Sequence, residues 1–384
     1  MGSFDLENLK TINAIIERDS KDTTYKFALL RGVIEISQEY QHLVKESGDS
    51  VSLPLGLLIE KWLLYFYPVI ESLAFLPQLH GEKPDSFHKR ISFRPLFKEV
   101  TDYYAGKGGF SAFYNDYVNG SLDPEISPAV YALIAKIRTT ITTMPMKHLG
   151  RSQGHRDYSV FSYNRDARRI PAGMPVGQES VVQYSGTFSF RKDLFLVFQY
   201  LGSFISGDDS LVYQWAEFTR KASGGTLAVA AVMETLRTMP ETERAVSEAR
   251  QVYTQLYQNY HHLACVWSGK PITDMRLLHV DHMIPFSVWK NNNLWNLMPA
   301  YESINAKKRD MIPSPDFIEK RSDAIVTNWN SMYEVYPKRF LREINIALVG
   351  SPEQSSGWQD VALERLGEKC AYLIDVRGFD AWSL

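Results

Sequence analysis

The stretch Leu277–Pro313 reads LLHVDHMIPFSVWKNNNLWNLMPAYESINAKKRDMIP. A short apolar run ends in Asp281-His282, a proline-containing loop follows, and the chain then reaches Trp295-Asn296-Leu297. The next segment is expected to be a helix, and it places Asn305 three residues ahead of Lys308. Side chains at this spacing lie about one turn apart on the same face of a helix. The stretch therefore collects several polar side chains that can face one site.

These residue types suit the hydrolysis of a phosphodiester bond. Histidine has the unperturbed pKa that is best placed for taking a proton from water near neutral pH. A divalent cation stabilises the charge that develops on the transition state and on the leaving oxygen. Mg²⁺ prefers oxygen ligands and keeps several waters, so the Asp281 carboxylate and the Asn305 amide are suitable donors. Lys308 is expected to contact a phosphate oxygen.

The layout resembles the HNH (ββα-metal) nuclease family over residues 260–313. The family signature is an Asp-His pair at a strand end, an Asn in the following loop, and Asn-x-x-Lys on a closing helix, and all occur here in this order. The run Asp281-His282-x-Ile284-Pro285 is similar to the HNH domain of RNA-guided CRISPR nucleases. The resemblance implies that His282 is the general base and that Asp281 and Asn305 hold one Mg²⁺ or Mn²⁺. It also implies that Asn296 orients the loop or the base, and that cleavage leaves 5′-phosphate and 3′-hydroxyl ends.

The sequence departs from this family at the positions of a structural zinc. Many HNH proteins carry two Cys-x-x-Cys pairs, which would fall here at Cys265 and Ser268 and at Tyr301 and Ile304. Three of the four thiolates are missing, so these positions cannot form a closed tetrahedral zinc site. We expect no structural zinc, with Trp267, Tyr301 and Ile304 packed in its place.

Three residues beside the motif keep two interpretations each. His279 lies two residues before Asp281, so on a strand it faces the same side and either supports the metal or phosphate or makes a structural hydrogen bond. Lys307 and Arg309 are either solvated or in contact with the DNA backbone.

A basic cluster precedes the motif in a chain whose formal net charge is only −2. Because the whole molecule does not attract phosphate, nucleic-acid binding requires local clusters. Residues 151–192 hold seven basic and three acidic side chains, including Arg165, Arg168 and Arg169, with Tyr158, Phe161 and Tyr163 among them. One interpretation is a phosphate-binding surface with aromatic side chains for stacking. The other is a salt-bridged pair of strands with core aromatics.

The fold class predicted from the sequence is α+β, a mostly helical multi-domain protein with a ββα-metal (HNH) module. Apolar residues recur at helical spacing from Tyr25 to Ile36, and a buried helix broken at Pro68 is expected after Pro54. A third helix is expected from Pro128 to Ile141. Four regions follow from the pattern: a helical N-terminal region (1–150), a mixed α/β middle region with the basic cluster (151–245), the nuclease module (246–313) and a helical tail (314–384).

Further elements are expected in the middle region and the tail. The segments Tyr158–Tyr163 and Val181–Phe190 are rich in β-branched and aromatic residues and predict strands. Pro240 is expected to open a long helix. The tail from Phe317 is expected to be helical with a break near Gly350.

Several function classes are excluded or disfavoured. The two cysteines, Cys265 and Cys370, form no disulfide framework and fit a reducing cytoplasm. Residues 1–10 show no signal peptide, and charged residues and Pro68 interrupt the most apolar segment, so no membrane association is expected. The sequence contains no Walker loop, dinucleotide fingerprint or Gly-x-Ser-x-Gly elbow.

The function expected is therefore a metal-dependent HNH endonuclease that hydrolyses DNA in restriction or anti-phage defence. Two alternatives remain open: a nuclease subunit of a larger activated defence complex, and a non-catalytic DNA-binding protein that keeps the HNH fold. The expected partner is DNA, and a second copy of the chain or a defence-system protein stays open as a further partner.

Overall fold

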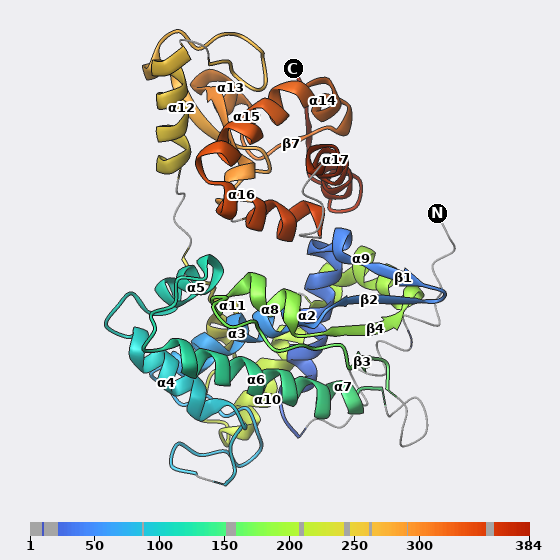
Figure 1. Cartoon of the computed structure of the whole chain (residues 1–384). Helices are drawn as coiled ribbons and strands as arrows, with labels where there is room; N and C mark the ends of the chain where they lie inside the picture. The colour runs from blue at the N-terminus through green and yellow to red at the C-terminus, as the bar shows by residue number, and fades with distance from the viewer. Residues whose placement is uncertain are drawn as a thin grey trace. The chain divides into compact units, whose positions relative to one another are not determined.

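The computed structural model describes Lys10 and residues 22–86, 88–150, 159–206, 211–241, 246–260, 263–289, 291–350 and 357–384. The chain forms two compact units, residues 1–241 and 242–384, and each has its own hydrophobic core (Figure 1). Each unit thus combines two of the four regions expected from the sequence. The described part is mainly helical with small sheets, as the predicted α+β class requires.

The first unit is a set of helices around a small antiparallel sheet. The strand order is β1-β2-β4-β3, so β2 and β4 pair at its centre and the strands run side by side in Figure 1. The strands are β1 (Lys45–Ser47), β2 (Ser50–Pro54), β3 (Ser162–Asn164) and β4 (Thr187–Arg191). The helices are α2 (Tyr25–Glu39), α3 (Leu55–Glu71), α4 (Arg94–Tyr104), α5 (Gly109–Asn119), α6 (Ser127–Thr143), α7 (Pro145–His148), α8 (Gln178–Tyr184), α9 (Lys192–Ser206), α10 (Tyr213–Ala222) and α11 (Val229–Arg237).

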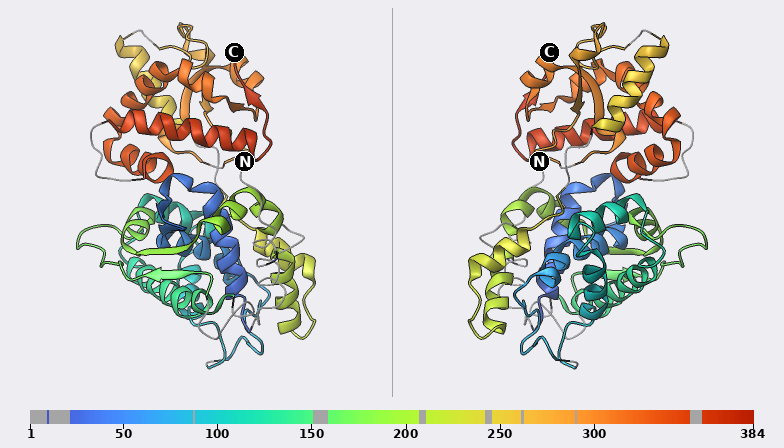
Figure 2. Two further views of the ribbon diagram at one scale, coloured as in Figure 1. Left: turned by 90° about the vertical axis from the view of Figure 1, so that its right-hand side faces the viewer. Right: turned by 90° about the vertical axis from the view of Figure 1, so that its left-hand side faces the viewer.

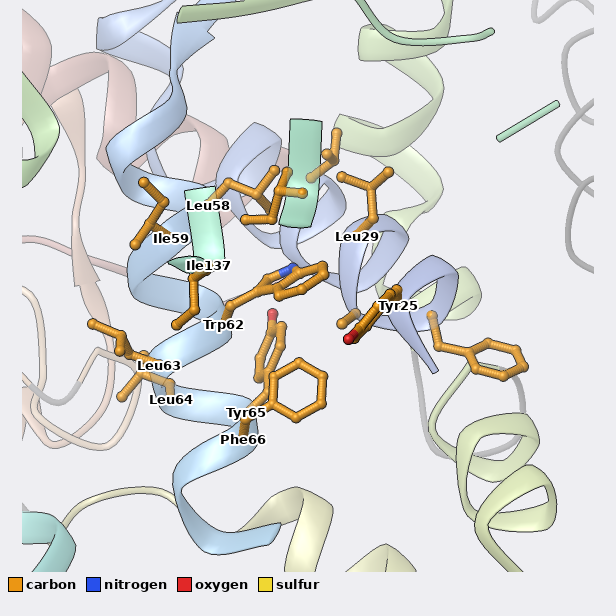
Figure 3. Close-up of a cluster of buried hydrophobic side chains, with 14 of the residues drawn as sticks. Tyr25, Leu29, Leu58, Ile59, Trp62, Leu63, Leu64, Tyr65, Phe66 and Ile137 are labelled. Carbon is orange, nitrogen blue, oxygen red and sulfur yellow. The ribbon is translucent and has the colours of Figure 1, made fainter. Parts of the chain in front are cut away.

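Helices α2 and α3 pack closely in the core of this unit. Trp62 of α3 is fully buried, and its ring centroid lies 5.5 Å from that of Tyr25 of α2. Figure 3 shows both side chains within the cluster of buried residues. Close approach depends on Gly32, because a Cβ there would lie 2.5 Å from a Leu58 methyl carbon. Three predicted helices, over Tyr25–Ile36, after Pro54 and over Pro128–Ile141, are confirmed as α2, α3 and α6.

Charged side chains are buried where α2 and α3 meet. Lys61 Nζ lies 3.0 Å from Glu35 and 2.7 Å from Glu39, and Arg31 Nε donates to Glu35 at 2.9 Å. Burial acts to raise the pKa of Glu35, but Lys61 and Arg31 outweigh burial and lower that pKa to about 2. The ion pairs therefore keep Glu35 charged inside the unit.

Glu60 is a further buried carboxylic acid beside this network of ion pairs. The Tyr114 hydroxyl donates to its carboxylate at 3.0 Å, and the Gln178 amide donates at 2.9 Å. Burial raises the pKa of Glu60 despite these hydrogen bonds. The folded unit therefore favours the protonated form of Glu60 more than the unfolded chain does.

Three local predictions for the first unit were wrong or displaced. Helix α3 continues through Pro68 to Glu71, so the proline removes the one hydrogen bond that its missing N–H would donate four residues back but does not end the helix. The predicted strand Val181–Phe190 begins only at Thr187, and Val181 to Tyr184 close helix α8. The predicted strand Tyr158–Tyr163 appears as β3 from Ser162, while Tyr158 lies outside the described residues.

The second unit surrounds two small sheets with helices. Figure 2 shows it from two sides, with the long red helix α17 beside the orange elements. The strands are β5 (Leu278–His282), β6 (Leu297–Tyr301), β7 (Ile312–Pro313) and β8 (Ala381–Trp382). The helices are α12 (Ser247–Tyr260), α13 (Glu302–Lys308), α14 (Pro315–Lys320), α15 (Ser322–Val335), α16 (Pro337–Ile344) and α17 (Trp358–Asp375), with a π-helical turn over Asn345–Val349.

The tail is part of this second core rather than an appendage. Trp329 of α15 is fully buried and donates its indole N–H to the Trp295 carbonyl beside β6 at 2.7 Å. The predicted helical tail and its break near Gly350 are confirmed. The helix expected from Pro240 instead begins at Ser247 as α12, and Pro240 lies outside it. Cys370 packs inside α17, where burial raises the pKa of its thiol to about 12.

In the part of the chain described here, no helix is long and apolar enough to cross a lipid bilayer.

Candidate active site

A strand–strand–helix segment carries the candidate site. Strands β5 and β6 pair antiparallel, with Asp281 opposite Met298 and His282 opposite Leu297. Helix α13 follows β6 directly and packs against both strands. Asp281 and His282 thus stand at the end of β5, and helix α13 brings Asn305 and Lys308 toward that strand.

The Asp281 carboxylate is almost completely buried, and Trp267 and Lys308 lie within reach of it. The Trp267 indole N–H donates to Oδ2 at 2.7 Å. The Lys308 ammonium lies 3.3 Å from Oδ2 and 3.5 Å from Oδ1, and it also donates to the His282 carbonyl at 2.7 Å. Both charged groups have lost their water, so each depends on the other for compensation.

This position of Lys308 differs from the expectation of a phosphate contact. The Lys308 side chain is 0% exposed, so no phosphate reaches it in this arrangement. The physical reason is the unscreened Asp281 carboxylate beside it, which attracts the ammonium in a low-dielectric interior. The sequence placed Lys308 on the correct face of the helix, but its partner in this structure is the predicted metal ligand.

The His282 imidazole is enclosed at the end of β5. Its Nε2 lies 3.1 Å from the Asn292 Oδ1, and its ring centroid lies 5.2 Å from that of Phe286. A carboxamide oxygen only accepts hydrogen bonds, so this contact places the ring proton on Nε2 and the lone pair of the neutral ring on Nδ1. Asn292 therefore contributes to the orientation of the His282 ring.

Asn296 holds the loop between the two strands. Its Oδ1 accepts from the Ile284 N–H at 2.8 Å, and its Nδ2 donates to the Ile284 carbonyl at 3.1 Å and to the Asn291 carbonyl at 3.2 Å. The side chain is fully buried. Of the two roles expected for Asn296, these contacts are those of a residue that orients the loop next to His282.

Asn305 lies between two residues of α13 that both contact β5. Glu302, one turn earlier, is paired with His279 at 3.7 Å, and Lys308, one turn later, reaches Asp281. The half-buried Asn305 therefore lies on the face of α13 that carries these two contacts. The contact with Glu302 gives His279 a structural partner, although its ring is still 41% exposed.

The donor set suits a hard cation more than zinc. Asp281 and Asn305 offer a carboxylate and an amide oxygen, which are Mg²⁺ or Mn²⁺ ligands. Among the described residues, no group of three or more His, Cys, Asp and Glu side chains is placed to hold a metal. A cation at Asp281 would therefore take its remaining ligands from water or phosphate. The expectation that no structural zinc is present stays a prediction.

The other predicted DNA-binding residues are on the surface. Lys307 and Arg309 are exposed. Arg309 has φ 50° and ψ −119°, a conformation that favours glycine, and it lies in a tight turn closed by the Met311 N–H on the Lys308 carbonyl. Such a backbone costs on the order of 1 kcal/mol or more for a residue with a side chain.

The basic cluster is only partly described, because Arg151 and Arg156 lie outside the described residues. Arg165, Arg168 and Arg169 are exposed, and no ion pair joins them to the part of the chain that the structure describes. Arg191 and Lys192, in contrast, pair with Asp193 and Glu46. The aromatic Phe161 is buried. Elements of both interpretations therefore occur, and the phosphate-binding role stays a prediction.

Two family models match the chain. The larger match covers residues 5–236, more than half of the sequence, and is described as a domain of unknown function (DUF8808). The chain belongs to the DUF8808 family. The second model is described as HNH endonuclease and matches residues 265–314, the segment that contains β5, β6 and α13. This DUF8808 protein therefore carries an HNH module, which indicates nuclease activity on DNA. No curated protein and no solved structure matches the chain.

Sequence reasoning missed two residues that hold the site. Trp267 was expected only to pack in place of a zinc ligand, yet its indole N–H binds Asp281. Asn292 is one of three consecutive asparagines to which the sequence assigned no role, yet its side chain contacts His282. Neither contact follows from spacing, because each depends on how a loop folds over β5.

Proposed function

We propose that this protein is a metal-dependent HNH endonuclease that hydrolyses phosphodiester bonds in DNA, with a role in restriction or anti-phage defence. The observation that carries the proposal is the placement of Asp281 and His282 at the end of a strand that α13 closes. The role in defence rests on the usual setting of the family that the motif resembles.

His282 acts as the general base in this proposal. The Asn292 oxygen holds Nε2–H, so Nδ1 takes the proton from the attacking water. The imidazole is 0% exposed, so DNA and water reach it only after the residues that cover it move. Asn296, through the Ile284 and Asn291 backbone, keeps this loop in register with β5.

Asp281 and Asn305 are the residues that would hold Mg²⁺ or Mn²⁺. A bound divalent cation stabilises the charge on the scissile phosphate and the leaving oxygen. Lys308 now compensates the same carboxylate. An ammonium that leaves Asp281 becomes free to bind a phosphate oxygen, so the role expected for Lys308 and its observed contact are two states of one side chain.

A plasmid-cleavage assay tests the proposal. Wild-type protein is expected to nick or cut supercoiled DNA with Mg²⁺ or Mn²⁺ and to lose this activity in EDTA. His282→Ala should lower the rate by about 10²–10⁴-fold, the usual contribution of a general base. His88→Ala is the matched control, because His88 is exposed and lies in the other unit. Cleavage by His282→Ala at the wild-type rate with both metals would refute the proposed catalytic role of the site.

The buried state of His282 and Lys308 favours a second candidate, the nuclease subunit of a complex that is activated by a partner. Purified protein would then be inactive with Mg²⁺ alone and would gain metal-dependent cleavage when its cognate partner protein is added. Full activity of the purified chain alone would reject this candidate and keep the first.

A further inference from the structure

A basic cavity of about 560 Å³ opens in the second unit, outside the Asp281–His282 pair. Four cationic residues line it, and they come from three separate segments: Lys270 from the turn after Trp267, Lys307 from α13, and Lys320 and Arg321 from the end of α14. No Asp or Glu side chain is among the described residues that line it. Side chains so distant in sequence converge only because the fold brings them together.

These cations are not neutralised by neighbours. Within the described ranges, none of the four forms an ion pair. Arg321 is held in place, because its Nε donates to the Val266 carbonyl at 2.6 Å. The guanidinium lies against Gly269, where a Cβ would meet its terminal nitrogens at 3.1 and 3.2 Å. A glycine at this position therefore leaves room for a fixed guanidinium at the wall of the cavity.

The cavity also adjoins the candidate active site through one side chain. Trp267 lines it, and the indole N–H of Trp267 donates to Asp281 at 2.7 Å. Lys307 precedes Lys308, the residue paired with Asp281. The cavity wall further includes Ser268, Tyr301 and Ile304, three of the four positions at which zinc ligands were considered. The region thus presents an anion-binding surface one side chain away from the catalytic strand.

We propose that this cavity binds a phosphate group, and that its source is the backbone of the DNA strand being cut, at a phosphate other than the scissile one. This proposal rests on the proposed nuclease function. Fixed Arg and mobile Lys side chains are the groups that bind phosphate. The phosphate anchors the strand on one side of Trp267 while Asp281 and His282 act on the other side.

The test is DNA binding in EDTA, where cleavage cannot occur. The variant Lys270→Glu/Lys320→Glu reverses two exposed lysines that line the cavity. The matched control Lys338→Glu/Arg377→Glu makes the same change in charge at exposed positions that do not line it. Affinity for a labelled DNA duplex is measured by fluorescence anisotropy over a range of salt concentrations, and circular dichroism checks that each variant is folded.

Loss of two phosphate contacts is expected to weaken binding roughly 60-fold at about 0.1 M salt and to reduce the slope of log K against log salt by about two. The control pair should leave the slope unchanged. A second arm measures thermal stabilisation of wild type and variant by inorganic phosphate and by ATP. Unchanged DNA binding with stabilisation of wild type alone would assign the phosphate to a free molecule. Unchanged DNA binding without such stabilisation would refute the proposal that the cavity binds phosphate.

Failure of this proposal is distinguishable from failure of the nuclease. If the cavity variant binds DNA weakly while wild type cuts no DNA with any metal, the phosphate site is supported and the proposed nuclease activity is refuted. If both double variants bind DNA as wild type does while His282→Ala abolishes cutting, the nuclease activity is supported and the phosphate site in the cavity is refuted.

Discussion

The buried pair of Lys308 and Asp281 makes the strongest prediction for the second unit. Lys308→Met keeps most of the side-chain volume and removes the ammonium from its place 3.3 Å from the Asp281 carboxylate. The carboxylate keeps the Trp267 N–H as a donor, but it loses its ammonium partner while its burial is unchanged. The His282 carbonyl also loses its donor at 2.7 Å. We therefore expect a large loss of stability.

The magnitude follows from the separation and the burial of the two charges. At 3.3 Å, the Coulomb energy is roughly 5 kcal/mol for an effective dielectric constant of about 20. Removal of one partner of a buried pair typically costs about 3–5 kcal/mol, because an uncompensated charge remains. For a unit of this size, that loss corresponds to a decrease in Tm of roughly 10 °C.

The assay is calorimetric unfolding, with hydrogen exchange at the amides of β5 and β6 to report on the second unit separately. Lys307→Met is the matched control: the neighbouring side chain is exposed, so its change should stay within about 0.5 kcal/mol. The double variant Lys308→Met/Asp281→Asn removes both charges and should recover much of the loss. A cost below about 1 kcal/mol for Lys308→Met would refute a buried ion pair at this site.

The same variant tests whether the cation proposed for Asp281 competes with Lys308. Without the ammonium, the carboxylate is free of its positive neighbour, so Mg²⁺ should bind the variant more tightly than wild type. At about ten times the Kd, Mg²⁺ would stabilise the variant by about 1.4 kcal/mol. Equal effects of Mg²⁺ on the Tm of wild type and Lys308→Met would contradict the competition.

Three further predictions concern other parts of the chain. Burial raises the pKa of Glu60 above its usual 4.5. The folded unit favours the protonated carboxyl, so Glu60 makes its full contribution to the free energy of unfolding below about pH 4.5, and this contribution is lost as pH rises through the raised pKa of the folded state. Glu60→Gln should therefore stabilise the first unit at pH 7 and flatten its pH profile in thermal melts, and a less stable variant at pH 7 would contradict this. Arg309→Gly should raise the stability of the second unit by about 1 kcal/mol in urea unfolding, because it relieves a positive φ of 50°; no gain would mean that Arg309 is unstrained. Arg168→Glu/Arg169→Glu should weaken DNA binding at low salt, and unchanged affinity in gel shifts would remove the phosphate-binding role of the basic cluster.

Helices were predictable from the sequence where apolar residues at helical spacing form one face that packs against the core. Apolar residues at helical spacing gave α2, since the pattern and the burial coincide from Tyr25 to Ile36. Periodicity failed at Val181–Tyr184, where β-branched residues favour a strand. There the Ser180 hydroxyl bonds to the Gly177 backbone and closes the first turn of α8, and this local contact outweighs the propensity.

The sequence predicted the order of the candidate site residues along the chain, but it did not predict which side chains contact one another. Asp281, His282, Asn296, Asn305 and Lys308 lie close in sequence, so strand and helix periods suffice to bring them to one end of β5. The partner of each side chain depends on burial, which spacing does not report. The cavity was beyond prediction, because Lys270 and Lys320 converge only through the docking of α14.

The proposed chemistry and the observed contacts compete for the same atoms. In the proposed reaction Asp281 would hold a divalent cation, whereas in this structure it compensates Lys308. His282 would activate a water molecule, whereas here it is buried. Exchange of Lys308 for a cation removes an interaction of several kcal/mol, and each 1.4 kcal/mol changes the population of the active arrangement about tenfold. A metal ion alone would therefore have to offset a large difference in population between the observed and the active arrangement. If the proposed phosphate site beside Trp267 is occupied by DNA, its binding free energy would add to that of the cation, and both together would populate the state in which Lys308 turns from Asp281 to phosphate.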